Sequence, residues 1–123
     1  MGREHISFSD RNSVLVMNVP AKLDNDHLAG LPGTTLRFMN QFQAAGLVVD
    51  ASHMQCFESC FAETIMEIAD RVDRMGKRMV IAGMRPVVSS SAQRYGLDFD
   101  KVLSTMYIDI ALDLIEAIKS RKG

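Results

Sequence analysis

The clearest pattern of apolar and polar positions in the chain lies between Leu47 and Met75. A short apolar run, Leu47 to Val49, is long enough for one buried strand and ends at Asp50. After a mostly polar loop, apolar residues recur at gaps of 4, 3, 4 and 3, which keeps them on one helix face: Phe61, Ile65, Ile68, Val72 and Met75. The segment therefore predicts a strand, a loop and a helix that begins near Ser59.

The rest of the chain repeats this alternation of strand-like and helix-like segments. Strands are predicted around Ile6–Phe8, Ser13–Val19, Leu47–Asp50, Lys77–Ala82 and Val102–Ser104. Helices are predicted from about Asp26 or Pro32 to Ala45, and over Ser59–Met75, Pro86–Tyr95 and Ile108–Ser120. Gly46 and Gly76 are expected to cap the helices that precede them. The order β-β-α-β-α-β-α-β-α requires crossover connections, and hence a mostly parallel sheet whose first two strands can pair antiparallel.

Composition fits one domain over residues 1–123. Hydrophobic residues make up 47% of the 123 positions, and a domain of this length buries roughly 65% of its unfolded surface. Nine methionines contribute to that fraction. Their simplest role is to fill irregular gaps in the core, and the alternative is an adaptable contact surface.

Charge and hydropathy exclude several classes of partner. Fourteen basic and fifteen acidic residues give a net charge of −1, which argues against a nucleic-acid-binding face. The one basic cluster is Lys119, Arg121 and Lys122 near the C-terminus. No signal peptide is visible, and no apolar run approaches the ~18 residues of a membrane span. A cytoplasmic location is therefore expected, with Cys56 and Cys60 as reduced thiols.

Common enzyme motifs do not occur in the sequence. The phosphate-binding patterns GxGxxG and GxxxxGK and the nucleophile pattern GxSxG are missing. A thiol phosphatase loop needs an arginine six residues after its cysteine. At that distance Cys56 is followed by Ala62 and Cys60 by Met66.

Two groups of residues could bind or activate a ligand, although both also fit structural roles. His53, Cys56 and Cys60 offer three possible zinc ligands but no fourth, so a loop histidine and packing cysteines are the favoured interpretation. His5 and His27 are expected at the surface.

Three carboxylates, Asp24, Asp26 and Asp50, could gather at one edge of the sheet, as in phosphoryl-transfer sites. Acids that follow strands also form caps and turns, and this structural interpretation is favoured.

Ser59 is the remaining candidate. A serine at a helix start can simply be a cap worth ~1 kcal/mol, and Glu58 and Glu63 fit an acidic bias of the first turn. The functional alternative is that Ser59 accepts a phosphoryl group. The helix amides and dipole would tolerate this anion, while its charge would repel a protein docked over the helix. Ser59 would then be a reversible switch.

The sequence resembles the STAS domain family, and within it the RsbS-type anti-sigma-factor antagonists of the bacterial stressosome. The resemblance covers about residues 13–118. One motif is a strand ending in Asp50 with a loop that leads to the pair Glu58–Ser59, and the other is the turn from Gly83 to Val88. The matching runs are VVDASHMQCFESCFAETIMEIA, MGKRMVIAGMRPVV and YGLDFDKVLSTMYIDIALDLI.

The resemblance implies an α/β, SpoIIAA-like fold: a small, mostly parallel sheet with about four helices packed mainly on one side. It implies a non-enzymatic protein without cofactors that binds a serine kinase related to histidine-kinase ATPases. It also implies assembly with paralogous STAS proteins in homo- or hetero-oligomers. The phosphoacceptor carried over is Ser59, with Ser52 as a second possibility. The partner-binding residues are then Glu58, Ser59, Ala62 and Glu63.

The chain departs from the usual family pattern at a few positions. Glu58 stands where Asp is usual, Cys60 where a larger apolar residue is common, and Val88 with Ser89, Ser90 and Ser91 where alanine follows the turn valine. Two alternatives stay open. One is a STAS subunit of a transporter assembly that docks on an ATPase, with Ser59 only a cap. The other is a small thiol or metal enzyme that uses Cys56 and His53.

Overall fold

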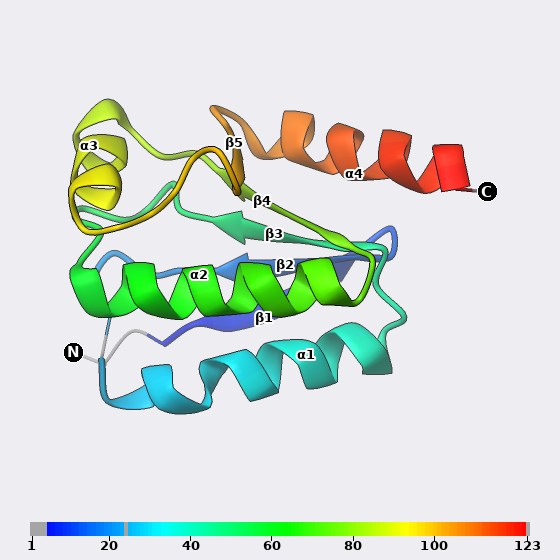
Figure 1. Ribbon diagram of the computed structural model, residues 1–123, viewed down its shortest axis with the longest axis horizontal. Coiled ribbons are helices and arrows are strands. Elements are labelled where there is room, and N and C mark those ends of the chain that lie inside the picture. The colour runs from blue at the N-terminus through cyan, green and yellow to red at the C-terminus, as the bar shows by residue number, and fades with distance from the viewer. Residues whose placement is uncertain (1–4, 24, 123) are drawn as a thin grey trace.

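The computed structural model describes residues 5–23 and 25–122, which form a five-stranded sheet and its helices (Figure 1). The strands are β1 (Ser7–Arg11), β2 (Val14–Asn18), β3 (Gly46–Asp50), β4 (Arg78–Ala82) and β5 (Leu103–Thr105). The helices are the 3-10 helix η1 (Asn25–Gly30), α1 (Leu31–Gln41), α2 (Ser59–Arg74), α3 (Pro86–Arg94) and α4 (Ile108–Lys122). The predicted order of strands and helices is confirmed. Of the two predicted helix starts, Pro32 lies in the first turn of α1, and Asp26 belongs to η1.

The sheet has the strand order β1-β2-β3-β4-β5, with β1 and β5 at its edges. β1 and β2 pair antiparallel and every other pair is parallel, as the sequence predicted. The β1–β2 hairpin turns at Asn12 and Ser13, whose φ angles are 54° and 66°. Two consecutive positive φ angles are typical of a tight two-residue hairpin turn.

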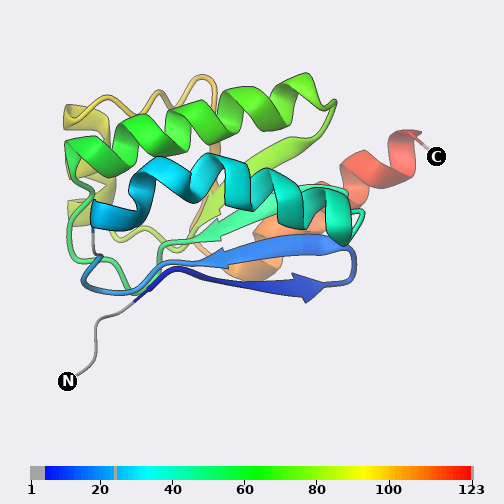
Figure 2. The same cartoon turned by 90° about the horizontal axis from the view of Figure 1, so that it is seen from below.

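Both faces of the central strands are buried, as expected for parallel strands covered by helices. Residues such as Leu15, Leu47 and Ile81 face one core, which also holds side chains of α1, α2 and α3. Val16 and Val48 face the opposite core, which α4 closes. Figures 1 and 2 show α1 and α2 along one face of the sheet and α4 on the other. The prediction of helices mainly on one side is confirmed, and α4 is the exception.

The methionines differ in burial. Met17, Met39, Met54 and Met79 are buried, which confirms core packing for these four. Met106 is 66% exposed.

Gly46 corrects one expectation, because it does not cap α1. The helix ends at Gln41 with Phe42 as its C-cap, and Gly46 opens β3. A Cβ atom there would lie 2.8 Å from a side-chain atom of Ile115 and 2.9 Å from the Arg78 carbonyl oxygen. Glycine therefore allows α4 to approach the sheet closely at this position.

Within the described ranges, no helix combines the length and apolarity that crossing a bilayer requires.

Candidate functional site

Ser59 is the first residue of α2 and is exposed to solvent. Glu58 precedes it as the N-cap residue, with extended backbone angles of −79° and 160° and no side-chain capping bond. A capping serine would occupy the N-cap position and accept a hydrogen bond from an amide of the first turn. Here Glu58 occupies that position and Ser59 is the first helical residue. The interpretation of this serine as a simple cap is therefore wrong. Its hydroxyl lies free beside the amide groups at the start of the helix, which lack partners within the helix.

The first turn of α2 is fixed to the core by aromatic side chains on either side of Ser59. Phe57 and Phe61 are both buried, with ring centroids 5.0 Å apart and an interplanar angle of 47°. Such tilted pairs contribute about 0.5–1.5 kcal/mol beyond the burial of their surface. Ile65, Ile68 and Val72 continue the buried face of the helix, as the sequence predicted. Ser59 therefore projects from a rigid helix end.

The β3–α2 loop begins with a turn at Asp50. The backbone N–H of Ser52 donates to Asp50 Oδ1 over 3.0 Å. Gly83 lies against this turn, because a Cβ atom at that position would be 2.9 Å from the Ser52 Cβ. Gly83 also has a φ of +83°, which favours glycine. The close approach of the two backbones fixes where the loop leaves the sheet.

Two side chains of the α3 segment hold the middle and the end of the same loop. Arg85 Nη2 donates to the Met54 carbonyl oxygen over 2.6 Å. The backbone N–H of Phe57 donates over 3.0 Å to Ser91 Oγ, which itself donates to the Val88 carbonyl oxygen over 2.9 Å. Sequence reasoning missed both residues as parts of the site. Ser91 belongs to the serine run that departs from the usual family pattern.

A pocket of about 210 Å³ opens beside the N-cap of α2. It lies between the segment that follows β2 and the β3–α2 loop. Leu23, Met54 and Phe61 give it apolar walls, while Lys22 and Glu58 add opposite charges to its lining. The surface next to Ser59 therefore contains a pocket whose lining is partly apolar and partly charged.

The predicted partner-binding residues are only partly available at the surface. Glu58, Ser59 and Glu63 are exposed, and so is the second candidate acceptor, Ser52. Ala62 is 0% exposed, so the prediction that its side chain contacts a partner is wrong. The residue lies on the inner face of α2, one turn after Glu58, whose carbonyl accepts its N–H. The first turn of α2 contains no acidic residue, because Glu63 lies beyond it.

The possible zinc ligands are not brought together. Among residues 5–23 and 25–122, no three histidine, cysteine or acidic side chains are placed to hold a metal ion. Cys56 and Cys60 are free thiols, as expected, but both are exposed, so the prediction that they pack in the core is wrong. The neighbouring Phe57 and Phe61 take the inward positions instead.

The histidines and the acidic residues mostly take structural or surface positions. His5 and His53 are exposed, while the His27 side chain and Asp24 lie outside what the structure describes, as do the side chains of Lys119, Arg121 and Lys122. Asp26 is exposed in η1, and the half-buried Asp50 forms the turn with Ser52. The structural interpretation of Asp50 is thus confirmed.

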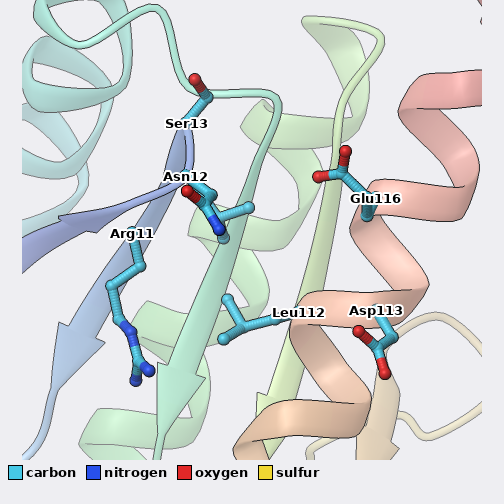
Figure 3. Close-up of a pocket in the computed structure, with 7 residues that line it drawn as sticks. Arg11, Asn12, Ser13, Leu112, Asp113 and Glu116 are labelled. Atoms are coloured by element: carbon cyan, nitrogen blue, oxygen red, sulfur yellow. The ribbon is translucent and has the colours of Figure 1, made fainter.

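A second hollow, of about 350 Å³, lies away from Ser59 between the β1–β2 turn and α4 (Figure 3). Its lining carries charges of both signs, from Arg11 on the strand side and from Asp113 and Glu116 on α4. The acidic side chains therefore lie on the flank of α4 that faces the hairpin.

The sequence matches the STAS domain family over residues 5–112. A search among curated proteins finds no significant match.

Solved structures share the fold at low sequence identity. A variant of RsbS from Moorella thermoacetica has a TM-score of 0.82 at 18% identity, with 94% of this chain and 97% of that chain covered. A chain of the stressosome, described as a signal integration and transduction hub, has a TM-score of 0.79 at 18% identity, covering 92% and 98%. Phosphorylated SpoIIAA from Bacillus has a TM-score of 0.66 at 11% identity, covering 89% and 98%. The fold is thus the SpoIIAA-like fold, and the chain belongs to the STAS domain family.

Proposed function

We propose that this protein is a non-enzymatic interaction module controlled by phosphorylation of Ser59. Its partner is a serine kinase of the histidine-kinase-like ATPase class, which docks over the start of α2. Glu58 and Glu63 contribute to the docking face together with Ser59. The observation that carries the proposal is the free, exposed Ser59 hydroxyl at the end of a helix whose preceding loop is fixed at three points.

Phosphorylation at this position changes charge without disturbing the fold. The unpaired amides and the positive end of the helix dipole stabilise an anion at the first turn. The core contacts of Phe57 and Phe61 lie beneath the helix and stay unchanged. The phosphate adds up to two negative charges beside Glu58 and Glu63, so a kinase docked there meets like-charge repulsion and leaves.

The related structures support both parts of the proposal. One is SpoIIAA in its phosphorylated form, and another is RsbS with a serine replaced by glutamate, which carries a negative charge at that position. A third related structure describes the molecular architecture of the stressosome, a signal integration and transduction hub. We therefore extend the proposal to assembly with copies of this chain or with paralogous STAS proteins.

The test compares the wild type with Ser59→Ala and Ser52→Ala after incubation with labelled ATP and a serine kinase of the histidine-kinase-like ATPase class. We expect label on the wild type and on Ser52→Ala but not on Ser59→Ala. Phosphorylated wild type should also lose the kinase in a pull-down that retains the unmodified protein. Equal label on Ser59→Ala would remove Ser59 from its role, and retention of the kinase after phosphorylation would refute the repulsion mechanism.

A further inference from the structure

Five large apolar side chains lie exposed around β5 and α4, away from the Ser59 site. Met106 and Tyr107, in the connection between the two elements, are 66% and 61% exposed. Ile110 and Leu114 on α4 and Leu103 on β5 are also exposed. We call these five residues the α4 apolar patch.

The patch occupies one flank of α4 that the protein's own core leaves free. Tyr107, Ile110 and Leu114 are spaced three and four residues apart and so share a helix face, while Ala111 and Ile115 face the sheet. The acidic residues of the described part of the helix, Asp109, Asp113 and Glu116, lie on another flank, and Figure 3 shows two of them beside the hairpin hollow. An exposed flank that is apolar and uncharged resembles the buried centre of a protein interface, where charged residues are depleted.

The patch continues onto an edge strand. Leu103 pairs with Val80, whose side chain packs under α4, so Leu103 lies on the same face of the sheet as the helix. The other edge strand, β1, carries the charges of Asp10 and Arg11, which discourage pairing with another chain. β5 has the sequence LST and carries no charge. Its free edge therefore lacks that protection.

Hydrogen bonds hold the patch in place before any partner binds. The Thr105 hydroxyl donates to the Tyr107 carbonyl oxygen over 2.9 Å, and the N–H of Gly83 donates to the Thr105 carbonyl oxygen over 2.9 Å. The Tyr107 carbonyl also accepts the N–H of Ala111 over 3.3 Å, at the start of α4. These bonds fix the backbone that carries Tyr107, and tyrosine is one of the residue types enriched among the energetic hot spots of interfaces.

We propose that the α4 apolar patch binds the same patch on a second copy of this chain, around a two-fold axis. Side chains of this size and exposure present on the order of 500 Å² per copy, which is in the range of the largest apolar patch on a typical monomer, and such patches are often functional. Two copies would bury about 1,000 Å², which reaches the lower limit of a specific interface. A two-fold contact needs only this one surface, because each copy supplies the complement of the other.

This pairing extends the assembly part of the proposed function and rests on it for its biological role. α4 covers the sheet face opposite to α1 and α2. A dimer formed through α4 therefore leaves Ser59 on each copy open to the kinase.

The test measures the mass of the protein in solution by sedimentation or light scattering over a dilution series. We expect the wild type to reach twice the chain mass of 13.7 kDa. Met106→Lys and Ile110→Lys should each weaken self-association at least tenfold, because both bury a charge at the contact. Val87→Lys is the matched control, since Val87 is as exposed as Met106, at 66%, but lies on α3. It should dimerise like the wild type.

Three outcomes would overturn the proposal. They are a monomeric wild type at millimolar concentration, unchanged dimers in both patch variants, and pairing only with a paralogous STAS chain. Circular dichroism verifies that each variant is folded, and two independent patch variants guard against one misfolded protein. Ser59 labelling of Met106→Lys separates the two proposals. If Met106→Lys no longer dimerises but is still labelled at Ser59, the proposed phosphorylation of Ser59 is unaffected. If the wild type dimerises but is not labelled, only the phosphorylation proposal is refuted.

Discussion

Ser91 shows how a single hydroxyl on α3 positions the candidate phosphoacceptor on α2. Its oxygen accepts the N–H of Phe57, two residues before Ser59, and its own proton goes to the Val88 carbonyl. Both bonds are partly buried, so water replaces them poorly when the hydroxyl is removed. The loop that carries Ser59 is therefore fixed by a residue outside the loop.

Replacement of this hydroxyl should loosen the loop without touching the helix. Ser91→Ala is expected to lower the free energy of unfolding by about 1 kcal/mol, because the Phe57 N–H loses its acceptor. Urea unfolding followed by circular dichroism measures this change. Ser90→Ala is the matched control, since Ser90 is exposed on the same helix, and its stability should stay within about 0.5 kcal/mol of the wild type. Equal stability of the two variants would contradict the role given to Ser91.

The order of strands and helices could be predicted from the sequence, because each depends on local spacing. Runs such as Leu47 to Val49 and the 4-3-4-3 pattern of α2 report burial directly. On α4, spacing puts Ala111 and Ile115 on one side of the helix, which the sheet covers. It does not show that the second apolar flank, with Ile110 and Leu114, stays uncovered. The spacing of apolar residues along a helix shows how many apolar faces it has, but not which face another element covers.

The candidate site divides in the same way. Ser59 and its exposure could be predicted, because the helix start was marked by the end of the polar loop. Arg85 and Ser91 could not, since their bonds to the loop join positions 31 and 34 residues apart in the sequence. Ala62 was predicted to lie on the exposed, partner-binding face of α2, but it lies on the buried face. It follows Phe61 on the buried face, which family resemblance alone does not reveal.

The contact between α4 and the sheet predicts a clear difference between two glycines. Gly46→Ala places a methyl group against Ile115 and the Arg78 carbonyl, so the free energy of unfolding should fall by about 2 kcal/mol. Gly33→Ala is the control: Gly33 lies in α1 with no atom within 4 Å of its added Cβ. Alanine favours helix there and should stabilise the protein by about 0.5 kcal/mol. The midpoint temperatures of thermal unfolding should shift in opposite directions for the two variants. A shift in the same direction would refute the close packing of α4.

Across the whole molecule, Gly83 is where the Ser59 loop and the α4 apolar patch meet. A Cβ atom at Gly83 would lie 2.9 Å from the Ser52 Cβ at the start of the loop. The Gly83 N–H donates to the Thr105 carbonyl oxygen, just before the connection to α4. A side chain at this position would push on both. α2 and α4 lie on opposite faces of the sheet, yet Gly83 is next to the start of the Ser59 loop and is bonded to the residue that precedes Met106.

Gly83→Ala is therefore expected to slow Ser59 phosphorylation and to weaken self-association together, whereas Met106→Lys should affect only self-association. The substituted residue must keep a φ of +83°, at a cost of about 1–2 kcal/mol, and its methyl group must also displace Ser52. Gly76→Ala isolates the cost of the positive φ from the displacement of a neighbour. Gly76 has a φ of +76° but no atom within 4 Å of an added Cβ. It should lose similar stability and keep both activities. If Gly76→Ala impairs them as much as Gly83→Ala does, general destabilisation explains the loss, and the two surfaces are not joined through Gly83.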